Sequence, residues 1–279
     1  MADILLDRMF GKVNLDERVL DNLLELQRLN LNLELCITDS RYLFEKFCTA
    51  ESLLRLKIAE LNLKSNFHLP FYGLQLGCKD HYIRELSLKL IMQGLHLAAE
   101  LQIPRSIMHL SFPPYIPIKG QQKWLDSFYR NLEKILEYCQ QKNITLLLEN
   151  THEHLPEIFS SIFENYPTGY LAMCLDIAHI YCYSPASFAE WWSACSDNIK
   201  VIHLSDNYGD EDSHLPLGDG KIDFRELFDA SAGKDLTYTL ETDVTGFAKS
   251  LEYIRELLPE KYNNRQSDSS RECIDSNGR

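Results

Sequence analysis

The sequence predicts a single (β/α)₈ TIM barrel, and three observations support this fold class. Short apolar runs alternate along the chain with longer stretches of helical period, which is the pattern of βα units around a parallel sheet. Eight such units can be counted, and eight is the number of strands that closes this kind of barrel. Most of the apolar runs are continuous, as is expected of strands that are covered on both faces. The expected strands are residues 4–6, 31–37, 65–68, 106–110, 144–149, 172–176, 199–203 and 236–241.

The helices between these strands are indicated by apolar side chains at helical spacing. Trp124, Phe128, Leu132, Ile135 and Cys139 recur at intervals of three and four residues, so they share one face of a helix. We expect that face to pack against the sheet. Similar stripes are found in residues 19–29, 83–101 and 247–258.

The length and composition of the chain are those of one globular domain. The 279 residues are 45% hydrophobic and 25% charged, which is enough to bury a large core. We therefore expect one domain over residues 1–262. Residues 263–279 are rich in Asn, Ser, Asp and Arg with almost no apolar side chains, so we expect them to form a disordered tail.

The sequence favours a cytoplasmic protein without a membrane partner. No run of 18 apolar residues occurs, and the first residues lack the basic and then apolar layout of a signal peptide. The eight cysteines are scattered without a CxxC pair, so they indicate neither a zinc knuckle nor a disulfide framework. The net charge of −13 also disfavours long-range attraction to a polyanion such as DNA, although bound metal ions would add positive charge.

The most informative feature of the sequence is the residue type that ends each expected strand. Six consecutive strands end in a side chain that can bind a metal: His68, His109, Glu149, Asp176, His203 and Glu241. The C-terminal ends of barrel strands meet at one rim, where the active sites of this fold form. Coincidence explains the pattern poorly, with a probability on the order of 10⁻² even if three positions are allowed per strand.

Carboxylates and imidazoles that converge without thiolates suit zinc, manganese, magnesium or a related divalent ion. His179 extends the set beyond Asp176, while Asp212 and His214 extend it in the loop after the seventh strand. Three roles fit these residues: further metal ligands, groups that orient the ligands, or substrate contacts. The alternatives differ by residue: His68 and His109 also fit hydrogen-bonded core histidines, and Asp212 also fits one more charge in the acidic loop 209–212.

Five motifs resemble the xylose isomerase-like TIM barrel superfamily over residues 1–258. This superfamily contains sugar isomerases and epimerases together with the endonuclease IV type of apurinic-site nuclease. The motifs are LLLEN at 146–150, MCLDIAHIY at 173–181, VIHLSDN at 201–207, HLPLGDGKIDF at 214–224 and TLETD at 239–243.

In the isomerase and epimerase branch, the resemblance implies that Glu149, Asp176, His203 and Glu241 coordinate one divalent ion. The two glutamates also move the proton, and His179 contacts a substrate oxygen. That branch often places an arginine near the position of His214, where this chain has a histidine.

In the nuclease branch, the resemblance implies three zinc ions held by nine residues, all of which this chain contains. They are His68, His109, Glu149, Asp176, His179, His203, Asp212, His214 and Glu241.

The expected loops at the rim favour a small sugar substrate over DNA. A nuclease needs a basic rim with a wedge to hold bent DNA, whereas these loops carry mixed charges. The basic residues are Arg8, Lys12, Arg41, Lys79, Lys119 and Lys123. The acidic residues are Asp39, Asp80, Glu153, Asp206, Asp210, Glu211 and Asp212. Phe71 and Tyr72 would serve as a wedge or stack on a sugar. The sequence therefore predicts a metal-dependent sugar or sugar-phosphate isomerase or epimerase that acts by proton transfer next to a carbonyl, with an apurinic-site phosphodiesterase as the alternative.

Overall fold

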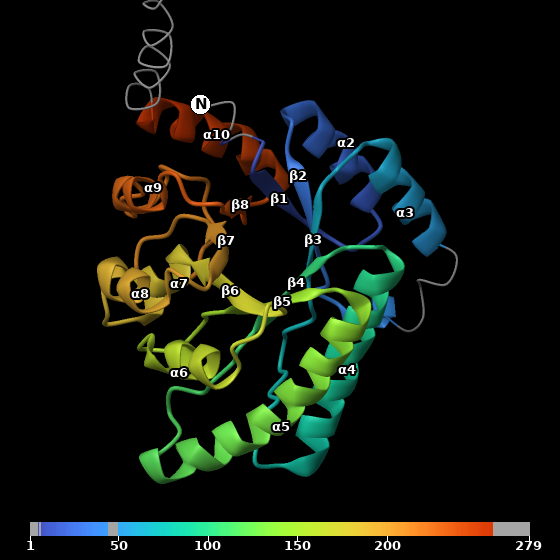
Figure 1. Cartoon of the computed structure of the whole chain (residues 1–279). Helices are drawn as coiled ribbons and strands as arrows, with labels where there is room; N and C mark the ends of the chain where they lie inside the picture. The colour runs from blue at the N-terminus through green and yellow to red at the C-terminus, as the bar shows by residue number, and fades with distance from the viewer. Residues whose placement is uncertain (1–4, 6, 44–49, 259–279) are drawn as a thin grey trace, which may run out of the picture.

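The computed structural model describes residues 5, 7–43 and 50–258, and it has the predicted fold (Figure 1). Eight parallel strands pair in sequence order, and β1 also pairs with β8, so the sheet closes into a barrel. The expected tail at residues 263–279 and the last residues of the expected domain lie outside the described residues. The strands are β1 (Met9–Asn14), β2 (Asn32–Cys36), β3 (Ser65–His68), β4 (Arg105–His109), β5 (Thr145–Glu149), β6 (Leu171–Asp176), β7 (Ile199–Leu204) and β8 (Thr237–Leu240).

Helices surround the barrel and follow the strands along the chain (Figure 1). The five apolar residues of the predicted stripe at 124–139 are all buried, which confirms that this face packs inward. In the described part of the chain, no helix is both long and apolar enough to cross a membrane. The helices are α2 (Val19–Leu29), α3 (Ala50–Glu60), α4 (His81–Glu100), α5 (Ile118–Lys142), α6 (Glu157–Asn165), α7 (Ile177–Tyr183), α8 (Phe188–Cys195), α9 (Arg225–Ser231) and α10 (Phe247–Leu257), with short 3₁₀ turns η1 (Ser40–Leu43) and η2 (Val244–Gly246).

The first strand is the element whose predicted position is wrong. It was expected at residues 4–6, of which residues 4 and 6 lie outside the described residues, and β1 begins at Met9 instead. Gly11 and Lys12 interrupt the apolar run of β1, so its sequence resembles a loop. A Cβ at position 11 would collide with side chains of Leu26 and Phe247, so this strand needs glycine where the helices pack against it.

Because β1 lies at residues 9–14, two basic residues that were expected in the loop after the first strand lie elsewhere. Lys12 lies within the strand, and Arg8 precedes it. The Arg8 guanidinium donates a hydrogen bond to the Lys234 carbonyl, just before β8, so it belongs to the opposite end of the barrel from the strand C-termini. Arg8 therefore contributes nothing to the charge of the rim.

The alternation of side chains along the strands separates the core into an inner and an outer layer. Buried residues that point into the barrel form a separate apolar cluster of Ile107, Leu147, Ala172, Cys174 and Val201. The residues two positions further along β4, β5, β6 and β7 point the same way. These residues are His109, Glu149, Asp176 and His203, at or next to the last residue of their strands, so the apolar cluster forms the floor beneath them.

Candidate metal centre

Glu149 lies at the centre of the cluster and is almost fully buried. Its Oε2 atom lies 3.1 Å from His68 Nε2 and 3.2 Å from His109 Nε2. Its Oε1 atom lies 3.1 Å from His203 Nδ1 and 3.7 Å from His179 Nδ1. The two oxygens of one carboxylate therefore face two different groups of histidines.

Three carboxylates converge on His203 Nδ1. Glu149 Oε1 and Glu241 Oε1 lie 3.1 and 3.2 Å from this nitrogen, and Asp176 Oδ2 lies 3.9 Å from it. A tetrahedral ion with bonds of about 2.0–2.2 Å holds its ligand atoms roughly 3.3–3.6 Å apart, so the spacing fits a shared cation. Asp176 Oδ2 is buried without a hydrogen-bond partner, and such an oxygen is costly unless a cation neutralises it.

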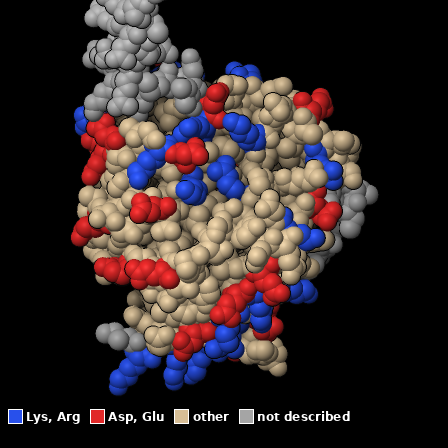
Figure 2. Space-filling model, in the orientation of Figure 1, with Lys and Arg blue, Asp and Glu red and all other residues tan. Residues whose placement is uncertain are grey.

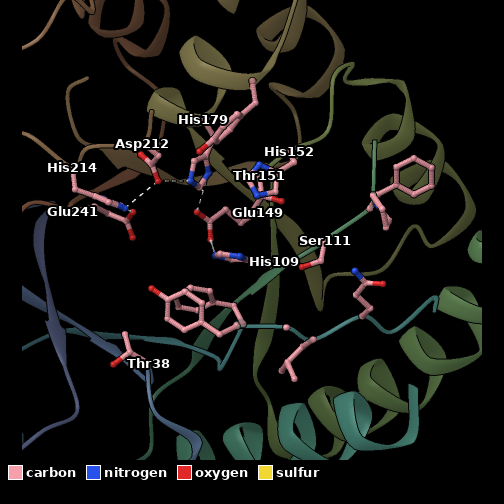
Figure 3. A pocket seen from close by; sticks show the side chains of 18 of the residues that line it. Thr38, His109, Ser111, Glu149, Thr151, His152, His179, Asp212, His214 and Glu241 are labelled. Atoms are coloured by element: carbon pink, nitrogen blue, oxygen red, sulfur yellow. Dashed lines mark hydrogen bonds and ion pairs between the residues drawn. The ribbon is translucent and has the colours of Figure 1, made fainter. Parts of the chain in front are cut away.

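Asp212 lies between His179 and His214 on one side of the cavity (Figure 3). Its Oδ2 atom lies 3.1 Å from His179 Nε2 and 3.0 Å from His214 Nε2. His214 Nδ1 in turn lies 3.7 Å from Glu241 Oε2. Asp212 is therefore part of the cluster, not merely a charge on an acidic loop.

The loop that carries Asp212 and His214 is fixed by another buried carboxylate. Asp206 accepts hydrogen bonds from the backbone N–H groups of Gly218, Gly220 and Ile222. These bonds hold the two ends of the loop together after β7, so Asp212 and His214 are presented toward the cavity by a fixed backbone.

The structure brings all nine residues expected from the sequence into one connected cluster. His68 Nδ1 contacts the Leu69 carbonyl at 2.9 Å, as a core histidine does, but its other nitrogen faces Glu149. The ligand atoms of His68, Glu149, His203 and Glu241 lie within 4.8 Å of one another, and so do those of Glu149, Asp176 and His179. Their roles as ligands stay a prediction.

The electrostatics of the cluster show an excess of negative charge. Burial raises the pKa of Asp176 to about 7, an effect that Glu241 and Glu149 reinforce and His179 opposes. Burial also acts upward on Glu241, but His203 and Lys12 outweigh it and lower its pKa to about 2. Burial lowers the pKa of His109 to about 4 in spite of the nearby Glu149. Neighbouring groups outweigh burial at His179 and His203 and raise their pKa values well above the usual 6.5, so a metal ion that binds there would displace their protons.

Lys12 is a site residue that the sequence reasoning placed in a loop. Its Nζ atom lies 2.9 Å from Glu241 Oε1, and it is the single Lys or Arg among the described residues that line the main cavity. Burial is the largest single effect on the pKa of Lys12 and acts to lower it, but the charge and hydrogen bond of Glu241, together with Cys36 and Glu149, outweigh burial and raise the pKa. The available signal was a lysine within the otherwise apolar run 9–13.

Glu34 is a second residue that the sequence reasoning missed. It is fully buried in β2, and its Oε1 atom lies 3.0 Å from His203 Nε2. Its Oε2 atom accepts a hydrogen bond of 2.8 Å from the Thr239 hydroxyl. A single charge between Leu33 and Leu35, in a strand expected to be covered on both faces, was the signal that pointed to it.

A cavity of about 620 Å³ opens above the cluster. One part of its wall is aromatic and includes Phe71, Tyr72 and Tyr115. Polar side chains at the ends of β1 and β2, Asn14 and Thr38, form another part. The cavity thus offers both stacking surfaces and hydrogen-bonding groups to a small molecule.

The outer surface carries mixed charges in the view of Figure 2. On this face, Lys and Arg side chains are interspersed with Asp and Glu side chains, and they form no wide basic surface. This distribution is in line with the net charge of −13.

The sequence matches one protein family and several uncharacterized proteins. The family described as xylose isomerase-like TIM barrel matches residues 34–257. The uncharacterized protein MJ1311 of Methanocaldococcus jannaschii is 26% identical over 68% of this chain and 69% of its own length. The uncharacterized protein MJ1614 of the same organism is 29% identical over 60% of this chain and 65% of its own length.

Solved structures resemble the whole described barrel. The TTHB071 protein from Thermus thermophilus, from a crystal soaked with ZnCl₂, is 28% identical with a TM-score of 0.78, covering 90% of this chain and 98% of that one. A D-tagatose 3-epimerase-like protein is 22% identical with a TM-score of 0.73, covering 90% and 97%. An L-ribulose 3-epimerase is 16% identical with a TM-score of 0.72, covering 95% and 99%. The likeness to the last two extends to the fold alone.

Proposed function

Because the chain belongs to the xylose isomerase-like TIM barrel family, we propose that it is a divalent-metal-dependent isomerase or epimerase of sugars or sugar phosphates. The observation that carries the proposal is the pair of glutamates, Glu149 and Glu241, whose Oε1 atoms both lie within 3.2 Å of His203 Nδ1. Two carboxylates thus meet beside one histidine nitrogen, below a cavity large enough for a small molecule.

Glu149, Asp176, His203 and Glu241 are the residues that would hold the ion, with zinc, manganese or magnesium as candidates. The unpartnered Asp176 oxygen and the convergence of three carboxylates on His203 fit such a group. When bound, a divalent ion polarises a substrate carbonyl and its neighbouring hydroxyl.

In this proposal the two glutamates move the proton on the carbon between these oxygens. An ionised carboxylate is the form that accepts a proton, and Glu241 is held in this form because His203 and Lys12 outweigh burial and lower its pKa. Glu149 takes the opposite side of the reacting carbon. Removal of the proton on one face and its return on the other gives an epimer, whereas return to the adjacent carbon converts an aldose to a ketose.

The walls of the cavity support a sugar as the substrate. A sugar presents hydroxyl groups at its edge and C–H groups on its faces, and these match polar residues such as Thr38 and aromatic residues such as Tyr72. The volume of about 620 Å³ lies in the range of small-molecule sites, roughly 300–1,000 Å³.

Solvent isotope exchange tests the proposal. A substrate incubated in D₂O should gain deuterium at the carbon beside its carbonyl, and the rate should fall sharply in Glu241→Gln. Glu153→Gln is the matched control, because Glu153 is an equally buried glutamate that contacts none of the nine clustered residues in the bonds it forms. Product analysis accompanies the exchange, since a hydride shift between carbons leaves no label. If no ketose, aldose or sugar phosphate on a broad panel is interconverted with zinc, manganese or magnesium, the proposal is wrong.

One observation favours a second candidate, an apurinic-site phosphodiesterase. Glu149 divides its two oxygens between two histidine groups, and Asp212 forms a third group with His179 and His214. Three such groups suit three ions, which would activate water and stabilise the leaving oxygen of a phosphodiester. We rank this candidate second because Lys12 is the single Lys or Arg among the described residues lining the cavity. Three bound zinc ions, and cleavage of abasic duplex DNA that is lost in His109→Ala, would reverse the order.

A further inference from the structure

We infer that Glu34 is a positioning residue that orients His203 and fixes which ring nitrogen faces the metal. The two side chains meet across the inside of the barrel, Glu34 from β2 and His203 from β7. Glu34 Oε1 lies 3.0 Å from His203 Nε2, and both side chains are fully buried. This contact is an ion pair at close range, and neither atom has a hydrogen-bond partner elsewhere among the described residues.

The other contacts of Glu34 hold its carboxylate in place for this task. The Thr239 hydroxyl donates to Oε2 at 2.8 Å, and the Asn66 amide donates to the same oxygen at 3.4 Å. Both partners contact Oε2, which leaves Oε1 directed at His203. Because a carboxylate without such partners is expensive to bury, its presence in an apolar strand calls for a specific use.

The geometry of the ring explains that use. His203 has its Nε2 atom toward Glu34 and its Nδ1 atom toward Glu149, Asp176 and Glu241. In a neutral imidazole, one nitrogen carries the proton and the other has the lone pair. A carboxylate at Nε2 keeps the proton on that nitrogen, so the lone pair of Nδ1 points at the ligand carboxylates. Carboxylates placed in this way orient metal-binding histidines and increase their basicity.

This inference rests on metal binding at His203, which is part of the proposed function, but not on sugar chemistry. Glu34 faces Nε2 of the His203 ring, whereas the proposed ligands Glu149, Asp176 and Glu241 face Nδ1. Glu34 is therefore expected to touch neither the ion nor the substrate. Its effect should therefore appear in metal affinity itself, measured without turnover.

The experiment measures the zinc affinity of the whole protein by competition with a chromophoric chelator. We expect Glu34→Ala to weaken binding by about 10- to 100-fold, the usual effect of removing such a partner. Glu34→Gln should weaken it less than Glu34→Ala, because its amide oxygen still accepts the Nε2 proton without a charge. Cys174→Ala is the control for disturbance around the ring, since the Cys174 thiol also neighbours His203, and it should keep wild-type affinity.

A second measurement uses the wild-type protein and does not depend on whether a variant folds. Long-range ¹⁵N–¹H spectra of the zinc-loaded protein should show His203 with its proton on Nε2. A proton on Nδ1 would overturn the inference, and so would folded Glu34 variants with unchanged affinity or an equal loss in Cys174→Ala. If the wild type binds zinc and the Glu34 variants bind it equally well, only this inference fails. If the wild type binds no divalent ion, the metal site fails, and the role of Glu34 fails with it.

Discussion

Lys12 and Glu241 form an ion pair across the seam where the barrel closes, with Lys12 Nζ 2.9 Å from Glu241 Oε1. Lys12 lies in β1, and Glu241 directly follows β8. Both side chains are largely buried, with exposed fractions of 17% and 2%. The pair places a permanent positive charge beside a carboxylate that is also proposed to bind the metal and move the proton.

Replacing Lys12 by Met should destabilise the protein more without a divalent ion than with one. Removal of one partner of a buried ion pair typically costs about 3–5 kcal/mol, and we expect a loss near or below the lower figure because His203 also faces Glu241. A bound ion would neutralise Glu241 and reduce this cost. Urea unfolding with a chelator and then with excess zinc measures the difference. Lys249→Met is the control, because Lys249 pairs with Asp219 at the surface and such pairs contribute no more than about 1 kcal/mol. Equal losses for Lys12→Met in both conditions would show that Glu241 is not a ligand.

Replacing Glu149 or Glu241 by Gln should abolish tight metal binding and lower turnover by about 10²- to 10⁴-fold, the usual contribution of a general acid or base. The fold should stay intact, because the barrel core below is apolar and independent of either carboxylate. Metal analysis and circular dichroism measure the two properties. Asp212→Asn provides the comparison: it should leave the ion at His203 in place if one ion is enough. Full metal content and unchanged turnover in both glutamate variants would contradict the assigned site.

Replacing Gly220 by Ala should displace the loop that carries Asp212 and His214. A Cβ at position 220 would collide with the Asp206 carboxylate and the Asn207 backbone. We expect a loss of stability of about 1–3 kcal/mol, as for other mutations that introduce a steric clash, and faster proteolysis within residues 207–222. Thermal unfolding and limited proteolysis provide the measurements.

Gly169→Ala is the matched control for the loop, since a Cβ at position 169 meets no atom within 4 Å. That variant should retain wild-type stability and proteolysis. If both alanine variants behave alike, the bonds around Asp206 do not determine the position of the loop.

The pH dependence of stability should reveal the buried Glu153. Burial raises its pKa above the usual 4.5, although backbone N–H groups of Thr151 and Phe112 oppose the shift. A raised pKa means that the folded state binds this proton more tightly than the unfolded state does. The contribution of Glu153 is therefore present in full below pH 4.5 and is lost as pH rises through the folded-state pKa.

Unfolding of the wild type and of Glu153→Gln should accordingly be compared from about pH 4 upward. The free energy of unfolding of the wild type should fall relative to that of the variant as pH rises. An exposed glutamate gives the control: Glu252→Gln should follow the wild type at every pH. Parallel curves for Glu153→Gln would show that Glu153 ionises at the same pH in both states.

The barrel and most of the cluster could be predicted because they depend on local patterns. Strands covered on both faces need continuous apolar runs, and seven of the eight predicted strands occur at the expected places. A charged or imidazole side chain at the end of such a run stands out, as Glu149 does after three leucines. Because parallel strands end at one rim, the residue types at these ends also predicted which side chains would meet.

Only the tertiary structure decided where β1 lies and that Lys12 and Glu34 belong to the site. By sequence alone, the run around Gly11 and Lys12 resembles a loop. In the folded protein, Leu26 and Phe247 pack against Gly11. Lys12 is neutralised by Glu241, which lies 229 residues further along the chain. Glu34 likewise has no partner in its own strand. Its contact with His203 exists only because closure of the barrel turns β2 and β7 toward the same interior. Charge compensation between distant strands depends on three-dimensional distance, which a local sequence pattern does not contain.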